Sequence, residues 1–237
     1  MATRAELVAY GRAQSDVVTL ARRDLVAWWA AVDTSDAVAA ARALEAFLPE
    51  LVAAYGDASA TVAADWYDEL RSTAAVRGSH RATLADPLPV EQVRATARWG
   101  VGPLFASEPD RDQALRLLGG AVQRLVQQGG RSTLAQNALR DPSPPRWARV
   151  PTSLSPCAFC VMLASRGFVY HSRQSAGEVD AYHDDCGCQP VPDWSPSPVL
   201  DGYDPDALYQ QYLGARAQAG GDTRAILAQM RQDLGIN

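Results

Sequence analysis

All four cysteines of this 237-residue chain lie between positions 157 and 188, and this clustering restricts the fold more than any other feature of the sequence. Cys157 and Cys160 form a CxxC motif, and the second group reads His183-Asp-Asp-Cys186-Gly-Cys188. A CxxC motif lets two thiolates reach one tetrahedral metal ion from a tight turn, and an HxxCxC motif adds up to three further ligands. The spacing therefore predicts that a cross-link draws the two segments together.

A structural zinc site is the favoured interpretation of this cluster, with four ligands taken from five candidates. The candidates are Cys157, Cys160, His183, Cys186 and Cys188. The first four in chain order form the preferred set, with Cys188 as a substitute or neighbour. His80 and His171 are expected to be surface or packing residues.

Two other interpretations of the cluster stay open. Disulfide bonds are the first, since four cysteines can pair fully, in any of three connectivities. A catalytic cysteine–histidine pair is the second. A thiol nucleophile needs only one cysteine and one oriented histidine, so it does not explain why four cysteines gather.

The composition of the chain is that of an ordinary globular protein without lysine chemistry. Hydrophobic residues make up 47% and charged residues 21%. All 22 basic residues are arginine, which excludes P-loop nucleotide sites, Schiff bases and nucleases that use a catalytic lysine. The net charge of −5 argues against broad sequence-independent affinity for DNA, because such affinity comes from neutralising phosphates.

Apolar periodicity predicts helix after helix over the first 140 residues. Thr3 and Glu6 form a capping-box pattern that begins the first helix, and Asp36 begins the second. Pro89 suits the first turn of a later helix that ends near residues 100–102. The aromatic residues at helical spacing, Trp66 among them, are expected to pack in a core.

Proline and glycine predict where these helices are interrupted. Pro49 is expected to kink or divide the second helix, and Gly56 to end it. A separate third helix is then expected over residues 62–74. The strong apolar stripe at 115–125 is expected to stop at Gly129-Gly130, with a short helix following over residues 132–140.

The predicted architecture is mainly α, in three parts. Residues 1–140 form a helical domain. Residues 141–198 form a small α+β module with proline-rich flanks, closed by the Cys/His cluster. Residues 199–237 form a helical C-terminal arm. Within the module we expect a short helix ended by Gly167, then a strand over residues 168–170.

The module resembles the C-terminal region of the phage Mu F-like minor capsid (head morphogenesis) family. The similar segments are SPCAFC at 155–160, ASRGFVY at 164–170 and HDDCGCQPVP at 183–192, and AADWYDEL at 63–70 is similar to the actinobacterial-phage branch. One departure is the acidic pair Asp184-Asp185, where the family often has proline and neutral or basic residues. This acidity weakens any direct role of the loop in binding phosphate.

The resemblance implies a structural virion protein with no reaction of its own. It implies a place inside the phage head, reached from the host cytoplasm during assembly. The implied partners are the portal protein and other head proteins, with at most weak contact to packaged DNA. No membrane contact is expected, since no stretch reaches the roughly 20 apolar residues of a membrane span.

The alternative function is a zinc-knuckle nucleic-acid-binding protein that acts in DNA packaging or ejection. It requires a basic face with interleaved aromatic residues. The candidates for that face are Arg140, Arg146, Trp147, Arg149, Arg166 and Arg173.

Overall fold

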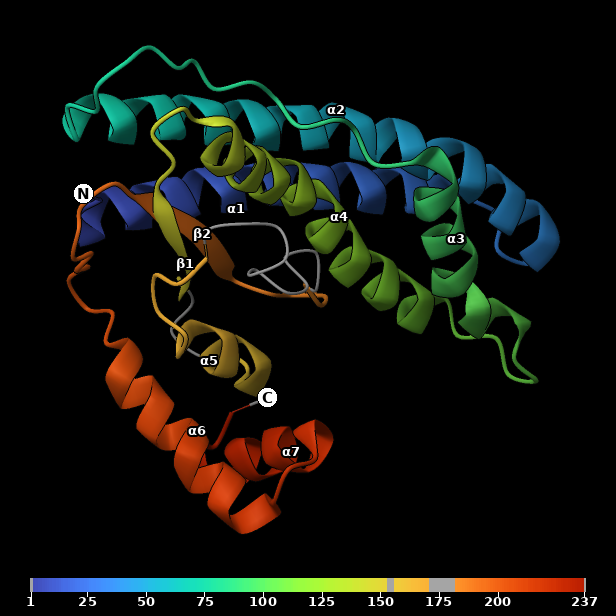
Figure 1. Cartoon of the computed structure of the whole chain (residues 1–237). Helices are drawn as coiled ribbons and strands as arrows, with labels where there is room; N and C mark the ends of the chain where they lie inside the picture. The colour runs from blue at the N-terminus through green and yellow to red at the C-terminus, as the bar shows by residue number, and fades with distance from the viewer. Residues whose placement is uncertain (1, 153–155, 171–181, 237) are drawn as a thin grey trace.

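The computed structural model describes residues 2–152, 156–170 and 182–236, and these residues are mainly α-helical, as predicted (Figure 1). The helices are α1 (Arg4–Ala31), α2 (Ala37–Thr73), α3 (Val90–Gly100), the 3-10 helix η1 (Gly102–Phe105), α4 (Arg111–Arg140), α5 (Ala158–Ala164), α6 (Pro205–Ala219) and α7 (Thr223–Leu234). The strands are β1 (Arg146–Pro151) and β2 (Cys188–Asp193). Within the described ranges, no helix has both the length and the apolar character needed to cross a membrane.

The predicted helix starts are confirmed by their caps. The Thr3 hydroxyl accepts a hydrogen bond from the Glu6 amide at 3.2 Å, and the Thr3 amide donates to the Glu6 carboxylate at 2.7 Å. Asp36 accepts from the Ala39 amide at 3.0 Å and caps α2. These contacts satisfy amides that have no partner within their helix, which explains why short local motifs locate the starts.

The predicted ends of α2 at Gly56 and of α4 at Gly129-Gly130 are wrong, and Pro49 does not divide α2. Helix α2 continues through Pro49 and Gly56, and α4 continues through Gly129 and Gly130. The glycines lie where the two helices cross: a Cβ added to Gly129 would lie 3.0 Å from the carbonyl carbon of Gly56 and closer still to its oxygen. Close packing of α2 on α4 therefore outweighs the low helix propensity of glycine.

Two hydrophobic clusters form the main core. One lies among α1, α2, α3 and α4 and includes Leu25, Leu44 and Leu118. The other joins α1, α2 and α4 to the β-sheet and includes Leu134 and Val191. The second cluster thus contains residues from both sides of the boundary predicted at 140–141, and the division of the chain into separate domains stays a prediction.

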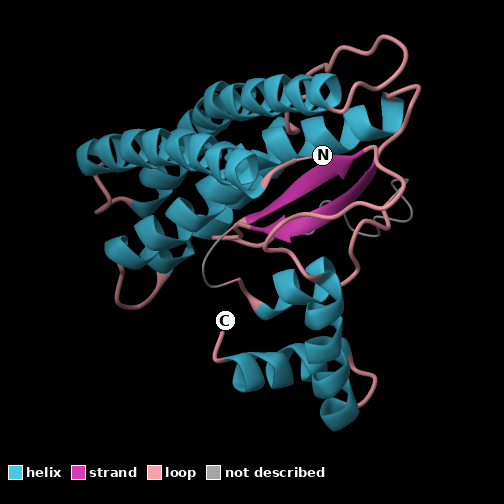
Figure 2. Cartoon of the chain, turned by 90° about the vertical axis from the view of Figure 1, so that its left-hand side faces the viewer, coloured by secondary structure: helices cyan, strands magenta, loops and turns pink. Residues whose placement is uncertain are grey.

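The β-sheet is a two-stranded antiparallel pair that packs beneath the long helices (Figure 2). Its register pairs Arg146 with Asp193 and Pro151 with Cys188. Residues 168–170 do not form the predicted strand. They contribute a single β-bridge, between Tyr170 and Trp147.

Helix α5 lies between the sheet and the α6–α7 pair (Figure 1). A small cluster joins α5 to the two C-terminal helices through Val161, Ile226 and Met230. This packing determines where the first two cysteines lie.

Candidate metal centre

The first half of the Cys/His cluster lies at the start of α5. Cys157 is the N-cap residue of this helix, and the Cys160 amide donates a hydrogen bond to the Cys157 Sγ at 3.3 Å. The cap turns both sulfurs to the same side. Gly167, with φ of +67°, follows the helix in the left-handed conformation that glycine adopts without strain.

The second half of the cluster is a turn that leads into β2. The Cys186 amide donates to the His183 carbonyl at 3.3 Å, and Asp185 takes a positive φ of 59° within the turn. Cys188 begins β2, and its pairing with Pro151 holds it beside β1. The sheet therefore determines where the second half lies relative to α5.

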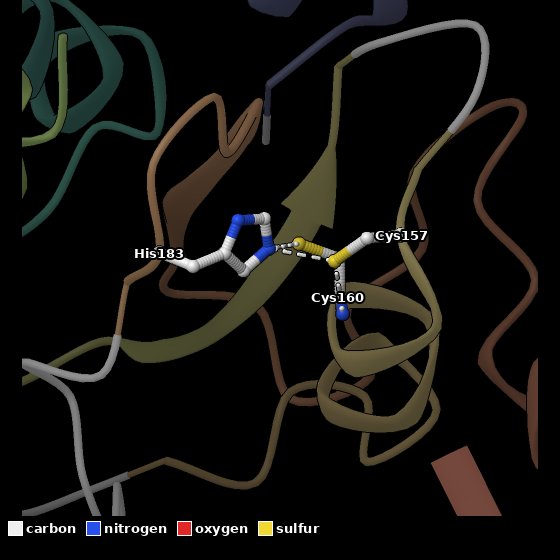
Figure 3. Close-up of side chains that lie close together, drawn as sticks. All are labelled: Cys157, Cys160 and His183. Carbon is white, nitrogen blue, oxygen red and sulfur yellow. Dashed lines mark hydrogen bonds between the residues drawn. The ribbon is translucent and has the colours of Figure 1, made fainter. Parts of the chain in front are cut away.

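The structure brings all five candidate ligands together. The Nε2 atom of His183 lies 2.7 Å from the Cys157 Sγ and 3.9 Å from the Cys160 Sγ (Figure 3). The Sγ atoms of Cys160 and Cys186 are 3.3 Å apart. Ligand atoms within 4.8 Å of one another form two groups that share Cys160: Cys157–Cys160–His183 and Cys160–Cys186–Cys188. All four cysteines are free of disulfide bonds, and the cluster could hold a metal ion.

The ring of His183 is oriented as a ligating histidine requires. Its Nδ1 lies 2.6 Å from the Asp184 carbonyl oxygen, a geometry in which Nδ1–H donates. This contact leaves Nε2 facing the sulfurs, where it can bind a metal ion once it has lost its proton. A hydrogen bond from the second ring nitrogen to a carbonyl is the usual outer support of a metal-bound imidazole.

The cluster already favours thiolates without a metal. Hydrogen bonds from Cys160 and, next, from His183 lower the pKa of Cys157 to about 4, while the Cys157 contact raises the pKa of His183 to about 9. Hydrogen bonds from Cys160 and Cys188 lower the pKa of Cys186. The two thiols that donate these bonds keep their protons, and a bound metal ion would displace them.

The two donor thiols have raised pKa values. For Cys160 the main cause is its hydrogen bond to Cys157. For Cys188, a hydrogen bond with Cys160 acts in the opposite direction, but the bond to Cys186 and burial outweigh it. Two nearby arginines favour thiolates by their positive charge. Arg131 acts to lower the pKa of Cys186, and Arg149 acts to lower the pKa of Cys188.

Two buried arginines lie against the second half of the cluster, and the sequence did not reveal this role. Arg131 of α4 donates from Nε to the Cys188 carbonyl at 3.2 Å and from Nη2 to the Cys186 carbonyl at 2.6 Å. The guanidinium carbons of Arg131 and Arg149 lie 3.8 Å and 3.9 Å from the centre of the Tyr182 ring. No local motif marks these residues, because their contacts span many positions in the chain.

The acidic pair Asp184-Asp185, at which this chain departs from the Mu F-like pattern that it resembles, holds the loop on the helices. Asp184 forms an ion pair with Arg124 of α4 at 2.7 Å. Asp185 forms one with Arg22 of α1 at 2.6 Å. In the sequence, this departure indicated only a weaker role in binding phosphate and did not predict the ion pairs.

The other candidate residues do not extend the cluster. His80 contacts Asn137 at 3.2 Å and packs edge-on against Tyr67, which confirms a packing role. His171 lies outside the described residues. Trp147 and Arg149 are buried, so neither contributes to the exposed basic face of the nucleic-acid hypothesis. Arg173 of that face also lies outside the described residues.

Comparison with known proteins gives the family. The family model described as VG15 protein matches residues 1–215. The Gene 15 protein of Mycobacterium phage L5 is 31% identical over 156 residues, which cover 57% of this chain and 49% of that protein. The Gene 15 protein of Mycobacterium phage D29 is 33% identical over 147 residues, covering 57% of this chain and 50% of that protein. This chain therefore spans about half the length of these relatives.

No solved structure matches the chain. The family match extends from the first helix into α6, so it includes both the helical body and the Cys/His cluster. The chain belongs to the VG15 protein family and has relatives in mycobacterial phages.

Proposed function

We propose that this protein is a structural component of a tailed-phage head, of the minor capsid or head morphogenesis type, associated with the portal and without a reaction of its own. The observation that supports it most is the closure of the Cys/His cluster, in the segment that resembles the Mu F-like family, on a chain whose relatives are phage proteins. A Cys/His cross-link of this kind suits a structural protein of an assembly, because it stabilises a small module whose own hydrophobic core is limited.

The test is incorporation into particles. The protein is co-produced with the portal and capsid proteins encoded in the same phage genome, and procapsids are separated by sedimentation. We expect the protein to co-sediment with procapsids that contain portal and to be lost from procapsids assembled without it. Absence from both kinds of particle, with the protein soluble and folded, would contradict the proposal.

We propose further that the metal is a structural zinc ion bound by Cys157, Cys160, His183 and Cys186. Thiolate and imidazole ligands favour zinc over hard cations such as Mg²⁺ and Ca²⁺, and four protein ligands leave no open position for catalysis. Protein purified without added zinc is expected to contain about one equivalent. Less than about half an equivalent, together with four titratable thiols, would contradict a zinc site.

Single substitutions distinguish the ligand sets. Cys188→Ser is expected to keep the metal, and Cys157→Ser and His183→Ala to lose it. Loss of metal in Cys188→Ser and retention in His183→Ala would instead assign the ion to the four sulfurs.

The contact between Cys157 and His183 also fits a second candidate function, a cysteine hydrolase. A thiolate beside an imidazolium is what a nucleophile and its general base present. Two observations favour the metal site. The Cys160 sulfur lies within 4.8 Å of the ligand atoms of both Cys157 and His183, and it is 3.3 Å from the sulfur of Cys186. Rapid alkylation of one cysteine that added zinc does not slow would support the hydrolase, whereas slow labelling that a chelator accelerates would support a closed metal site.

The nucleic-acid alternative is tested by retention on DNA as a function of salt. Strong retention with a steep dependence on salt would support a DNA-binding role. No retention at moderate salt would support a role in contacts between proteins.

A further inference from the structure

We propose that Arg131 and Arg149 are the counter-charges of a metal–thiolate complex of net negative charge, and that they set its affinity for a thiophilic divalent cation. This inference rests on the zinc site proposed above. It adds two residues that do not touch the metal but determine how tightly the site holds it.

The two arginines are buried beside the second half of the cluster. The exposed fraction of each residue is 1%. Both guanidinium carbons lie within 4 Å of the centre of the Tyr182 ring, at 3.8 Å and 3.9 Å. Both guanidinium groups therefore pack on the Tyr182 ring. Tyr182 is the residue immediately before His183, so these contacts help to hold the cluster's second half in place.

The hydrogen bonds of Arg131 do not neutralise its charge. They end on uncharged oxygens, the carbonyls of Cys186 and Cys188 and the amide of Gln127. Its Nη1 atom is buried and has no hydrogen-bond partner among the described residues. Burying a guanidinium without a nearby negative charge costs free energy, so we expect a negative charge beside Arg131.

The nearest carboxylates on the loop are already paired with other arginines. Asp184 pairs with Arg124 and Asp185 with Arg22. Within residues 2–152, 156–170 and 182–236, the cysteine sulfurs are the negative charges that remain beside the carbonyls bound by Arg131.

The charge of the complex follows from its ligands. The cluster contains one histidine, so four ligands include at least three cysteines. A divalent ion with three thiolates and a neutral imidazole carries a net charge of about −1, and one with four thiolates about −2. In either case the complex is a buried anion, and two adjacent arginine cations stabilise it. The same positive field disfavours a neutral or positively charged site.

Zinc affinity of matched variants tests the inference. Arg131→Gln and Arg149→Gln remove the charge but keep a polar side chain that can donate to the carbonyls. Arg131→Lys and Arg149→Lys keep the charge but lose the planar guanidinium. Dissociation constants are measured by competition with a chromophoric chelator at pH 7, after circular dichroism has established that each variant is helical. Cobalt absorption spectra report whether the thiolate coordination is unchanged.

Each Gln variant is expected to bind zinc about 10- to 100-fold more weakly, as substitutions in the outer support of a metal site do. The Lys variants are expected to lie close to the natural protein. The matched control is Arg71→Gln, which alters a buried arginine whose charge is neutralised by Asp141 at 2.7 Å, away from the cluster. It is expected to lower stability and leave zinc affinity unchanged.

The outcomes separate this inference from the zinc site itself. If the natural protein binds no zinc, both proposals fail. If it binds zinc and the Gln variants bind equally well, only the role of the arginines is overturned. Equal losses in the Gln and Lys variants would show that geometry, not charge, sets the affinity, and would also overturn it. If a Gln variant does not fold, its Lys partner decides, because a loss of 10-fold or more with the charge retained contradicts the inference.

Discussion

Gly129→Ala tests whether close packing, and not helix propensity, governs the crossing of α2 and α4. In an unobstructed helix this change would stabilise the protein by about 1 kcal/mol, since alanine is the better helix former. Here the new Cβ would lie 3.0 Å from the backbone carbonyl carbon of Gly56. Backbone atoms cannot rotate away, so we take the upper end of the overpacking cost, about 3 kcal/mol.

The two effects together lower the free energy of unfolding by about 2 kcal/mol. For a chain of this size that corresponds to a fall in melting temperature of about 4–8 °C. The measurement is urea unfolding followed by circular dichroism, with thermal melting as a second readout.

Two glycines in the same helices provide matched controls. A Cβ on Gly56 would meet nothing within 4 Å, and one on Gly119 would meet only the Arg22 side chain at 3.9 Å. Both alanine substitutions are therefore expected to stabilise the protein, by about 0.5–1 kcal/mol. If Gly129→Ala were as stable as the natural protein, or if all three variants shifted stability alike, the packing argument would be refuted.

Three further predictions follow from the buried groups. Arg71→Met leaves the Asp141 carboxylate buried without its ion pair, which is expected to lower the free energy of unfolding by about 3–5 kcal/mol in urea titrations. Cys160→Ser is expected to abolish zinc binding in metal analysis, because Cys160 belongs to both groups of ligands; full retention would remove it from the site. In metal-free protein at pH 6, Cys157 is expected to be alkylated faster than Cys188, because its pKa of about 4 keeps it a thiolate, and its rate should fall only as the pH drops toward 4. Labelling of Cys157 that already fell below pH 8 would contradict that pKa.

Local motifs accounted for a good part of the fold. The hydrogen bonds of an N-cap involve residues three positions apart, so Thr3 and Asp36 could be recognised without knowledge of the rest of the chain. The cysteine spacing similarly predicted which residues would meet. The interpretation as mainly α-helical followed from apolar periodicity, which reports burial of one helix face.

Helix ends within the body could not be predicted in the same way. Pro49, Gly56, Gly129 and Gly130 carry stop signals, yet both helices continue through them. A stop signal measures only the local cost of continuing a helix. The packing of α2 against α4 offsets that cost, and it depends on residues more than 70 positions apart.

The sequence by itself determined the helical class, the helix starts and the membership of the Cys/His cluster, because each depends on residues close together in the chain or on residue types that one metal ion would require. Only the tertiary structure decided that α2 and α4 are unbroken, that Asp184 and Asp185 hold the loop on the helices, and that Arg131 and Arg149 pack on Tyr182 beside the cluster. The physical reason is that these contacts join segments distant in sequence. Their energies come from burial and from charge at short range, neither of which exists until the chain has folded.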